Sequence, residues 1–237
     1  MINRHVSVLY ENIHYLIIHK PPGFLSQPGI SSDLRPIVLD DLIKHYKPIK
    51  DTEQWRSVHR LDSCVTGGML VAKTKNAATM FSRNLKLGGN KGFGLIRRYV
   101  ALTDNAPSVR IPSTGILKSD GMITQYRQVK NNCFIIDLVT GKKHQIRKHL
   151  SSLLHSPILY DQKYGSRATL GRDHIALHSA YIETKVGRTV KGHIIPIQPQ
   201  DQAIWETITT IDGRFLPDIE NELVRKPTLV NITNTVV

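Results

Sequence analysis

A short run of residues in the first third of the chain has the types and order needed for acid chemistry. The tetrad His59–Asp62 (His-Arg-Leu-Asp) is followed by the small residues Val65–Gly68 and then by the apolar run Met69–Ala72. A carboxylate in a small-residue turn that leads directly into a buried strand can lie at the floor of a cleft, here with the positive charge of Arg60 beside it. A second interpretation stays open, in which Asp62 only caps the turn or pairs with a cation.

A second candidate segment, residues 141–150, is rich in cations and in groups that can hold a substrate. Residues 143–154 have helical spacing, with an apolar stripe that begins at Ile146 and Leu150. His144 and Arg147 stand three positions apart on another face, so both can point into a cleft while the helix packs. The alternative for Arg147 is a solvated basic residue on the helix surface.

Other chemistries have little support in the sequence. His144, His149 and His155 do not converge on one helical face, and we therefore expect no metal site. The two cysteines cannot supply a disulfide framework or a four-thiolate zinc site. The chain has no nucleophile elbow, P-loop or zincin motif, and the glycine-rich stretch 87–94 favours a flexible surface loop.

The elements that must position these residues follow from the hydrophobic pattern. Short apolar runs predict strands, and apolar residues at helical spacing predict helices. Strands outnumber helices and do not alternate with them, which favours an α+β fold with a mainly antiparallel mixed sheet. We expect one catalytic domain over residues 1–217 and a loosely attached polar tail over 218–237. The expected strands are 6–9, 15–18, 69–72, 99–102, 133–139, 175–182 and 193–197, and the expected helices are 37–46, 75–86, 143–154 and 201–211.

The amino-acid composition and net charge limit the kinds of partner that this chain can bind. The 237 residues are 40% hydrophobic and carry a formal net charge of +13, which predicts a packed core and a polyanionic partner such as nucleic acid. No apolar run approaches the roughly 18–20 residues that a membrane span requires, so we expect no membrane partner.

The segments together resemble the RluA-type pseudouridine synthase family. That family's central signature is H-R-L-D, a T-S-G triplet and an apolar strand that ends in A-K; here the triplet reads Val65-Thr66-Gly67 and Cys64 replaces a frequent acid. Four further segments match in the family's order. They are Leu9–Gly23 with its K-P-x-G turn, Arg97–Ala101 for K-x-Y-x-A, Gly141–Leu150 for G-R-T-H-Q-I-R-x-H-L with continuation to Asp161 and Tyr164-Gly165, and Leu177–Ser179 for L-H-A.

The resemblance implies the pseudouridine synthase fold, isomerase activity on RNA, and roles for individual residues. Asp62 resembles the nucleophile, and whether it would attack the sugar or the base stays open. Tyr99 is similar to the tyrosine that stacks on the uracil, and Arg147 to the arginine that pairs with the catalytic acid and keeps it ionised. Arg60 resembles the residue that fills the space of the flipped base. The chemistry requires no metal and no cofactor.

RNA binding is assigned to the basic and polar residues of the same motifs. Target choice is expected to depend on the catalytic domain and its loops at 87–94 and 109–122. The predicted RNA-binding residues are His59, Arg60, Arg97, Arg98, Lys142, Lys143, His144 and Gln145.

Within the family, the chain looks most like the fungal mitochondrial enzymes that modify large-subunit ribosomal RNA. We therefore expect a monomeric enzyme that isomerises one uridine of structured ribosomal RNA, with a mitochondrial location suggested by the resemblance although residues 1–5 contain no clear presequence. One alternative is a transfer-RNA enzyme of the same family. The other is a catalytically silent RNA-binding or ribosome-assembly factor, which the departures at Cys64, Val65, Lys142 and Lys143 favour and the intact Asp62, Tyr99 and Arg147 oppose.

Overall fold

The computed structural model describes most of the chain, and every statement below concerns that part. It covers residues 5–29, 33–46, 51–86, 92–107, 111–170 and 173–226. Parts of the two loops expected to choose the target, residues 87–91 and 108–110, lie outside the described residues, as do residues 227–237 of the expected tail.

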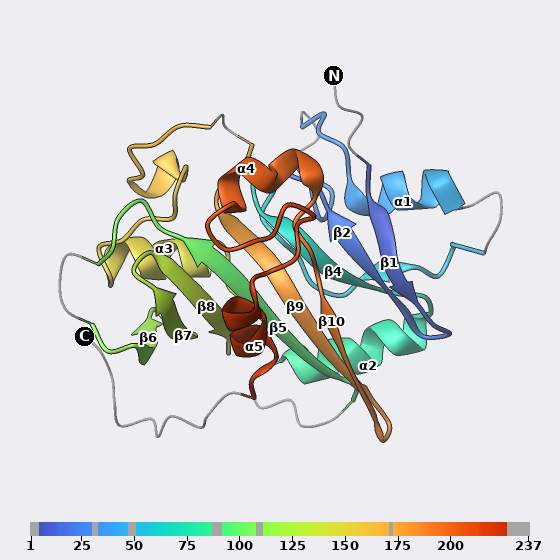
Figure 1. The fold of residues 1–237 in the computed structure, drawn as a ribbon. Coiled ribbons are helices and arrows are strands. Elements are labelled where there is room, and N and C mark those ends of the chain that lie inside the picture. The colour runs from blue at the N-terminus through green and yellow to red at the C-terminus, as the bar shows by residue number, and fades with distance from the viewer. Residues whose placement is uncertain are drawn as a thin grey trace.

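One large mixed sheet organises the described part of the chain (Figure 1). Its strand order is β1-β2-β4-β9-β5-β8-β7-β6, with β10 paired to β9 and β3 paired to β4. All of these neighbours are antiparallel except β4 and β9, which confirms the expected α+β class with a mainly antiparallel mixed sheet. The strands are β1 (Ser7–Glu11), β2 (Tyr15–Lys20), β3 (Arg56–Ser57), β4 (Thr66–Ala72), β5 (Gly94–Leu102), β6 (Thr114–Ser119), β7 (Met122–Lys130), β8 (Cys133–Leu138), β9 (Leu177–Val186) and β10 (Thr189–Ile194).

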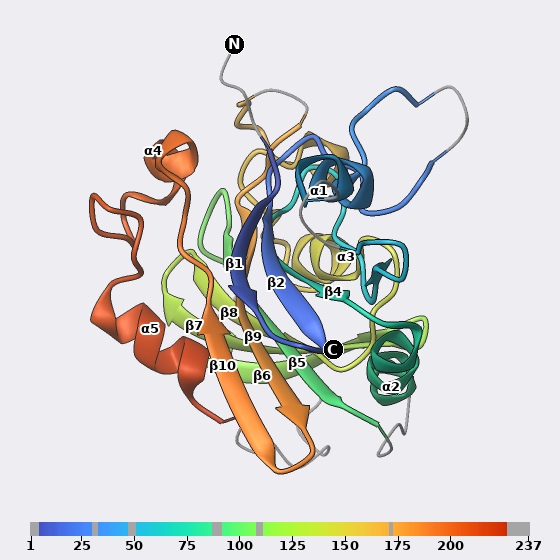
Figure 2. The same cartoon turned by 90° about the vertical axis from the view of Figure 1, so that its right-hand side faces the viewer.

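The helices cover both faces of this sheet. They are α1 (Val38–Tyr46), α2 (Lys75–Leu85), α3 (Gln145–Ser152), α4 (Gln202–Trp205) and α5 (Pro217–Val224). Figure 2 shows α1 and α3 on one side of the strands and α4 and α5 on the other. The expected helix 75–86 matches α2 to within one residue. Thr74 caps its first turn by accepting a hydrogen bond from Ala77 N at 3.1 Å.

The parallel contact between β4 and β9, which we call the seam, joins two halves of the sheet. Only two residue pairs are in register there, Thr66 with His178 and Gly67 with Ser179. Gly67 has φ = +107°, and a Cβ at this position would lie 2.5 Å from the Ser179 carbonyl oxygen. Glycine is therefore required for the close approach of the strands.

A buried histidine completes the seam. His178 Nε2 donates to the Ile195 carbonyl at 3.0 Å, which leaves Nδ1 to accept from Thr66 Oγ1 at 2.8 Å. Burial lowers the pKa of His178 to about 4, so the ring is neutral at neutral pH, as this hydrogen-bond pattern requires.

The expectation of a loose tail is wrong for residues 218–224. These residues form most of α5, whose Ile219 and Leu223 are both 0% exposed. Buried Arg98 donates to the Leu223 carbonyl at 2.6 Å, and Arg127 donates to that of Glu222 at 2.9 Å. Two apolar residues at i and i+4 suffice to dock a short helix, and the charged residues around them hid this pattern.

Strands β6 and β7 were not predicted from the sequence, and one helix is shorter than predicted. Residues 122–126 of β7 alternate between buried and half-buried positions, but Thr124 and Gln125 make the apolar alternation weak. The helix expected over 201–211 is only the four-residue α4, preceded by a 3₁₀ turn that begins at Pro199. No helix in the described ranges is both long and apolar enough to cross a membrane.

Candidate active site

Asp62 lies in the turn between β3 and β4, at the end of the seam. Its side chain is 18% exposed, and the backbone turns sharply after it, because Val65 N donates to the Asp62 carbonyl at 3.0 Å. The carboxylate is therefore open to a ligand on one side while the turn holds its backbone.

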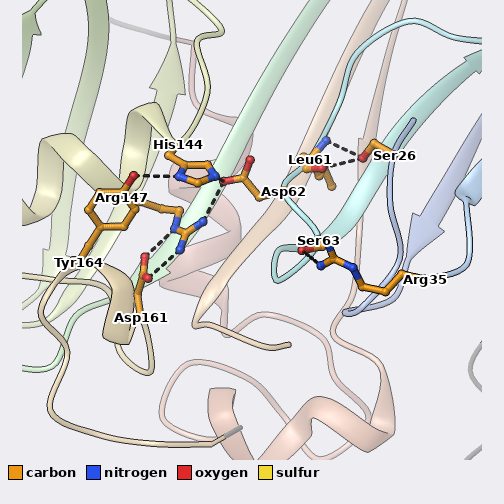
Figure 3. Close-up of polar contacts among 9 residues, drawn as sticks. All are labelled: Ser26, Arg35, Leu61, Asp62, Ser63, His144, Arg147, Asp161 and Tyr164. Atoms are coloured by element: carbon orange, nitrogen blue, oxygen red, sulfur yellow. Dashed lines mark hydrogen bonds and ion pairs between the residues drawn. The ribbon is translucent and has the colours of Figure 1, made fainter. Parts of the chain in front are cut away.

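Arg147 faces Asp62 from the first turns of α3 (Figure 3). Arg147 Nη1 donates to Asp62 Oδ2 at 3.2 Å, and Nε and Nη2 donate to the two oxygens of Asp161 at 2.6 and 2.8 Å. Burial alone would lower the pKa of Arg147, but the hydrogen bonds and negative charge of Asp161 outweigh burial and raise it. A permanent cation thus stands beside Asp62 with its orientation set by a second carboxylate.

His144 and Tyr164 complete the wall next to Arg147. His144 precedes α3 in a left-handed conformation, φ = +55°, with Nε2 3.8 Å from Asp62 Oδ2 and Nδ1 2.8 Å from the Tyr164 hydroxyl. Burial lowers the pKa of His144, so the ring is uncharged at neutral pH. The Tyr164 ring lies 4.9 Å from the Arg147 guanidinium carbon and supports that group by a cation–π contact.

Two side chains anchor the start of α3 to the sheet and thereby place His144 and Arg147. The Gln145 amide donates to Ile123 O and Thr124 Oγ1 at 2.9 and 2.8 Å, and its oxygen accepts from Thr140 Oγ1 at 2.8 Å. One turn later, His149 Nδ1 lies 2.9 Å from Thr124 Oγ1. Polar contacts to β7 therefore fix the position of the first turn of α3.

Tyr99 comes from β5 and lines the same pocket as Asp62. The space in this pocket, counted together with the open solvent at its mouth, is about 360 Å³. Tyr99 is 3% exposed, and burial raises the pKa of its phenol, which therefore stays protonated at neutral pH. The residues that line the pocket are Arg60, Leu61, Asp62, Val65, Tyr99, Leu138, Lys142, His144, Gln145, Ile146, Arg147 and Leu177.

Two wider grooves open from this pocket. The first groove, of about 810 Å³, includes Arg97, Lys142 and Lys143. The second groove, of about 1260 Å³, includes Lys143 and Lys163. Arg60 and Asp62 line the pocket and both grooves, so the carboxylate lies where the two basic grooves meet.

Three of the predicted RNA-binding residues are buried and bound to other groups of the protein, although Gln145 also lines the pocket and His59 the first groove. Arg98 is 1% exposed and pairs with Asp137 at 2.7 Å. His59 is 6% exposed, and its Nε2 accepts from Leu70 N at 3.0 Å. Gln145 is 3% exposed, and both atoms of its amide are already hydrogen-bonded. The other predicted RNA-binding residues line the pocket or the first groove: Arg60, Arg97, Lys142, Lys143 and His144.

Sequence reasoning assigned no role to Asp161 or Tyr164, although both stand in a segment that resembles the family. Asp161 is 14 positions from Arg147 and follows the helix, so no periodicity connects the two. The motif continuation through Tyr164-Gly165 was the available signal. Within the described ranges, no three or more His, Cys, Asp or Glu side chains form a group that could hold a metal ion.

The arrangement combines an acid, a fixed cation and a protonated phenol around one pocket between two basic grooves. Comparison with known proteins agrees with it. Residues 14–152 match the family model described as RNA pseudouridylate synthase. A Saccharomyces cerevisiae protein named 21S rRNA pseudouridine(2819) synthase is 42% identical, over 94% of this chain and 97% of that protein. The protein of the same name from Eremothecium gossypii is 40% identical, over 92% of this chain and 87% of that protein.

Solved structures show the same fold. The human RNA pseudouridylate synthase domain-containing protein 4 superposes with a TM-score of 0.65 at 20% identity, over 84% of this chain and 92% of that chain. The human domain-containing protein 1 gives 0.63 at 18% identity, over 94% and 96%. Since the family model spans more than half of the chain and these relatives match nearly all of it, the chain belongs to the RNA pseudouridylate synthase family and is an isomerase that acts on RNA.

Proposed function

We propose that this enzyme converts one uridine of the large-subunit ribosomal RNA of fungal mitochondria into pseudouridine, with Asp62 as the nucleophile. The observation that carries the catalytic part is the contact of Asp62 Oδ2 with Arg147 Nη1 at 3.2 Å, in a pocket that Tyr99 also lines. The ribosomal substrate and mitochondrial location are supported by the two fungal relatives named for 21S ribosomal RNA.

The reaction rearranges bonds within one nucleotide. The N1–C1′ bond breaks, the base rotates, and a C5–C1′ bond forms while the proton on C5 is lost and N1 gains one. Asp62 attacks either C1′ of the ribose or C6 of the ring and leaves again in the last step, so the balance needs no co-reactant. In both versions the base must leave its stack and enter the pocket.

The other pocket residues have distinct tasks in this proposal. Arg147 keeps Asp62 ionised and oriented, and Tyr99 supplies a ring face for the uracil and a hydroxyl that can move a proton. Arg60 is exposed where the pocket and grooves meet, so it is suited to fill the space that the flipped base leaves. Arg97, Lys142 and Lys143 bind the phosphates of the flanking nucleotides.

The test is a comparison of mitochondrial ribosomal RNA from wild-type cells, a deletion strain, and deletion strains that express Asp62→Ala or Asp212→Ala. Pseudouridines are mapped as primer-extension stops after carbodiimide treatment. We expect one stop to vanish in the deletion strain and to return with Asp212→Ala, an exposed carboxylate remote in the chain from the pocket residues, but not with Asp62→Ala. A stop restored by Asp62→Ala would refute the nucleophile, and a lost stop in transfer RNA would refute the ribosomal substrate.

A further inference from the structure

The backbone on either side of Asp62 is held by the last residue of β2 and the segment that follows it, which we together call the brace (residues 20–26). Leu61 precedes Asp62, and a single hydroxyl binds both of its backbone groups. Ser26 Oγ donates to the Leu61 carbonyl at 2.7 Å and accepts from Leu61 N at 2.9 Å (Figure 3). Both residues are 6% exposed, so solvent water does not replace these bonds.

The residue after Asp62 is bound by the same segment. The Ser63 carbonyl accepts from Gly23 N at 2.9 Å and from Lys20 Nζ at 3.0 Å. Gly23 has φ = +85°, which allows the turn that aims its N–H at Ser63. The brace therefore contacts the chain immediately before and immediately after Asp62.

The strand ladders do not reach this position. β3 ends at Ser57 and β4 begins at Thr66, so Asp62 is one of the eight residues between the two strands and lies outside both. A reacting group needs a fixed backbone, because misplacement by about 1 Å can lower the rate about 100-fold. At Asp62 the hydrogen bonds of the brace take the place of a ladder.

We propose that Ser26 is a positioning residue for Asp62. A serine hydroxyl has one proton and two lone pairs, which is the capacity needed to bind an N–H and a carbonyl of the same residue. Through Leu61, this clamp sets where the Asp62 carboxylate stands relative to Arg147 and the target nucleotide. The inference rests on the proposed function, because it takes Asp62 as the reacting group.

A residue that only stabilises the fold and a residue that positions Asp62 differ in what their loss changes. Loss of positioning lowers the rate of the chemical step in folded, RNA-bound enzyme. Loss of stability alone lowers the folded fraction and leaves that rate unchanged. The informative quantity is therefore the single-turnover rate at saturating enzyme, measured beside the Kd for RNA.

The experiment compares wild-type enzyme with Ser26→Ala and with the control Ser156→Ala. Ser156 is also buried, at 0% exposed, and donates to a backbone carbonyl, that of Leu154, at 3.1 Å. The substrate is a mitochondrial ribosomal RNA transcript tritiated at C5 of uridine, which releases tritium when C5 bonds to C1′. Circular dichroism verifies that each variant is folded at the assay temperature.

We expect Ser26→Ala to release tritium about 10- to 100-fold more slowly than wild type, with a Kd for RNA within about twofold, and Ser156→Ala to match wild type. An unchanged rate for Ser26→Ala, or an equal loss in Ser156→Ala, overturns the inference. If Ser26→Ala does not fold, Ser26→Cys and Ser156→Cys give the same comparison, since a thiol of similar size is a weak donor and acceptor. Wild-type enzyme that releases no tritium overturns the proposed function and this inference together, whereas an active wild type with an equally active Ser26→Ala overturns this inference alone.

Discussion

The Arg147 guanidinium donates hydrogen bonds to two carboxylates, and these bonds fix its orientation. Asp161 is 1% exposed and takes two of the three hydrogen bonds, at 2.6 and 2.8 Å, whereas the bond to Asp62 is longer, at 3.2 Å. The tighter pair holds the guanidinium, and the looser contact is left for the group that must react.

Asp161→Asn removes the charge that holds Arg147 while nearly preserving side-chain volume. We expect single-turnover tritium release to slow by about 10- to 100-fold, because Arg147 is free to turn away from Asp62. Asp104→Asn is the matched control, since Asp104 accepts hydrogen bonds from Ser166 and Arg167 and has no hydrogen bond to Arg147. Equal rates for the two variants would mean that Asp161 does not orient the cation.

Some of these residues could be predicted from the sequence and others could not. Asp62 and Arg147 stand in motifs with distinctive spacing, and the structure brings them together. Asp161 is joined to Arg147 only by the return of the chain after α3, which no local pattern encodes. His59, Arg98 and Gln145 are polar residues of the motifs, and their hydrogen bonds inside the protein were not predictable, because polarity alone does not show what a side chain contacts.

At the scale of elements, the seam is the most constrained contact. Gly67→Ala would force a methyl group against the Ser179 carbonyl, which lies 2.5 Å from the ideal Cβ position. We expect a fall of about 2–4 kcal/mol in the free energy of unfolding, from overpacking together with a strained positive φ. Urea unfolding followed by circular dichroism measures it.

Gly187→Ala separates the two causes. Gly187 also has a positive φ, +60°, but a Cβ there has no neighbour within 4 Å. It should cost only about 1 kcal/mol, the conformational part. Similar losses at both positions would show that crowding at the seam contributes nothing.

The elements were predictable where apolar runs are continuous. Every residue of β4 is buried, and its run 69–72 was found from the sequence alone. β7 carries a mixture of threonine, glutamine and arginine, and α5 has only two buried apolar residues, so neither element was predicted. The pairing of β4 with β9 depends on residues more than 100 positions apart and has no local signal.

At the scale of the whole molecule, buried neutral histidines make the fold sensitive to acid. The pKa of His178 is about 4 in the folded protein and about 6.5 in an unfolded chain. Between these values the unfolded chain binds more protons, so stability falls as pH drops from 6.5 to 4, by up to about 1.4 kcal/mol per pH unit for each such group. Burial lowers the pKa of His19 and His59 in the same direction.

Urea midpoints measured between pH 7 and 4.5 test this expectation. Wild type should lose stability on acidification, and His178→Asn should lose less of it because one proton-binding site of the unfolded chain is gone. His155→Asn, at an exposed position, serves as the control and should follow wild type. Identical pH profiles for all three proteins would contradict the assignment.

The basic grooves predict how RNA affinity responds to salt. Lys143 is exposed and lines both grooves, so Lys143→Gln should reduce the slope of log affinity against log salt concentration by about 0.7–0.9, the value of one phosphate contact. Arg188→Gln, in the turn between β9 and β10, should leave the slope unchanged. Filter binding of a ribosomal RNA transcript over a salt series gives both slopes; equal slopes would place Lys143 off the RNA path.

The narrow parallel contact at Thr66 and Gly67 has a consequence for inactivation. Asp62 is attached to the half-sheet of β1–β4, while Tyr99 and the helix that carries Arg147 are attached to the half-sheet of β5–β10. Neither half-sheet carries all three of these residues, so the reaction centre is complete only when the two half-sheets are joined. Mild heating that loosens the contact between the half-sheets should abolish turnover while the circular dichroism signal is still native. Activity should therefore be lost at a lower temperature than the midpoint of thermal unfolding.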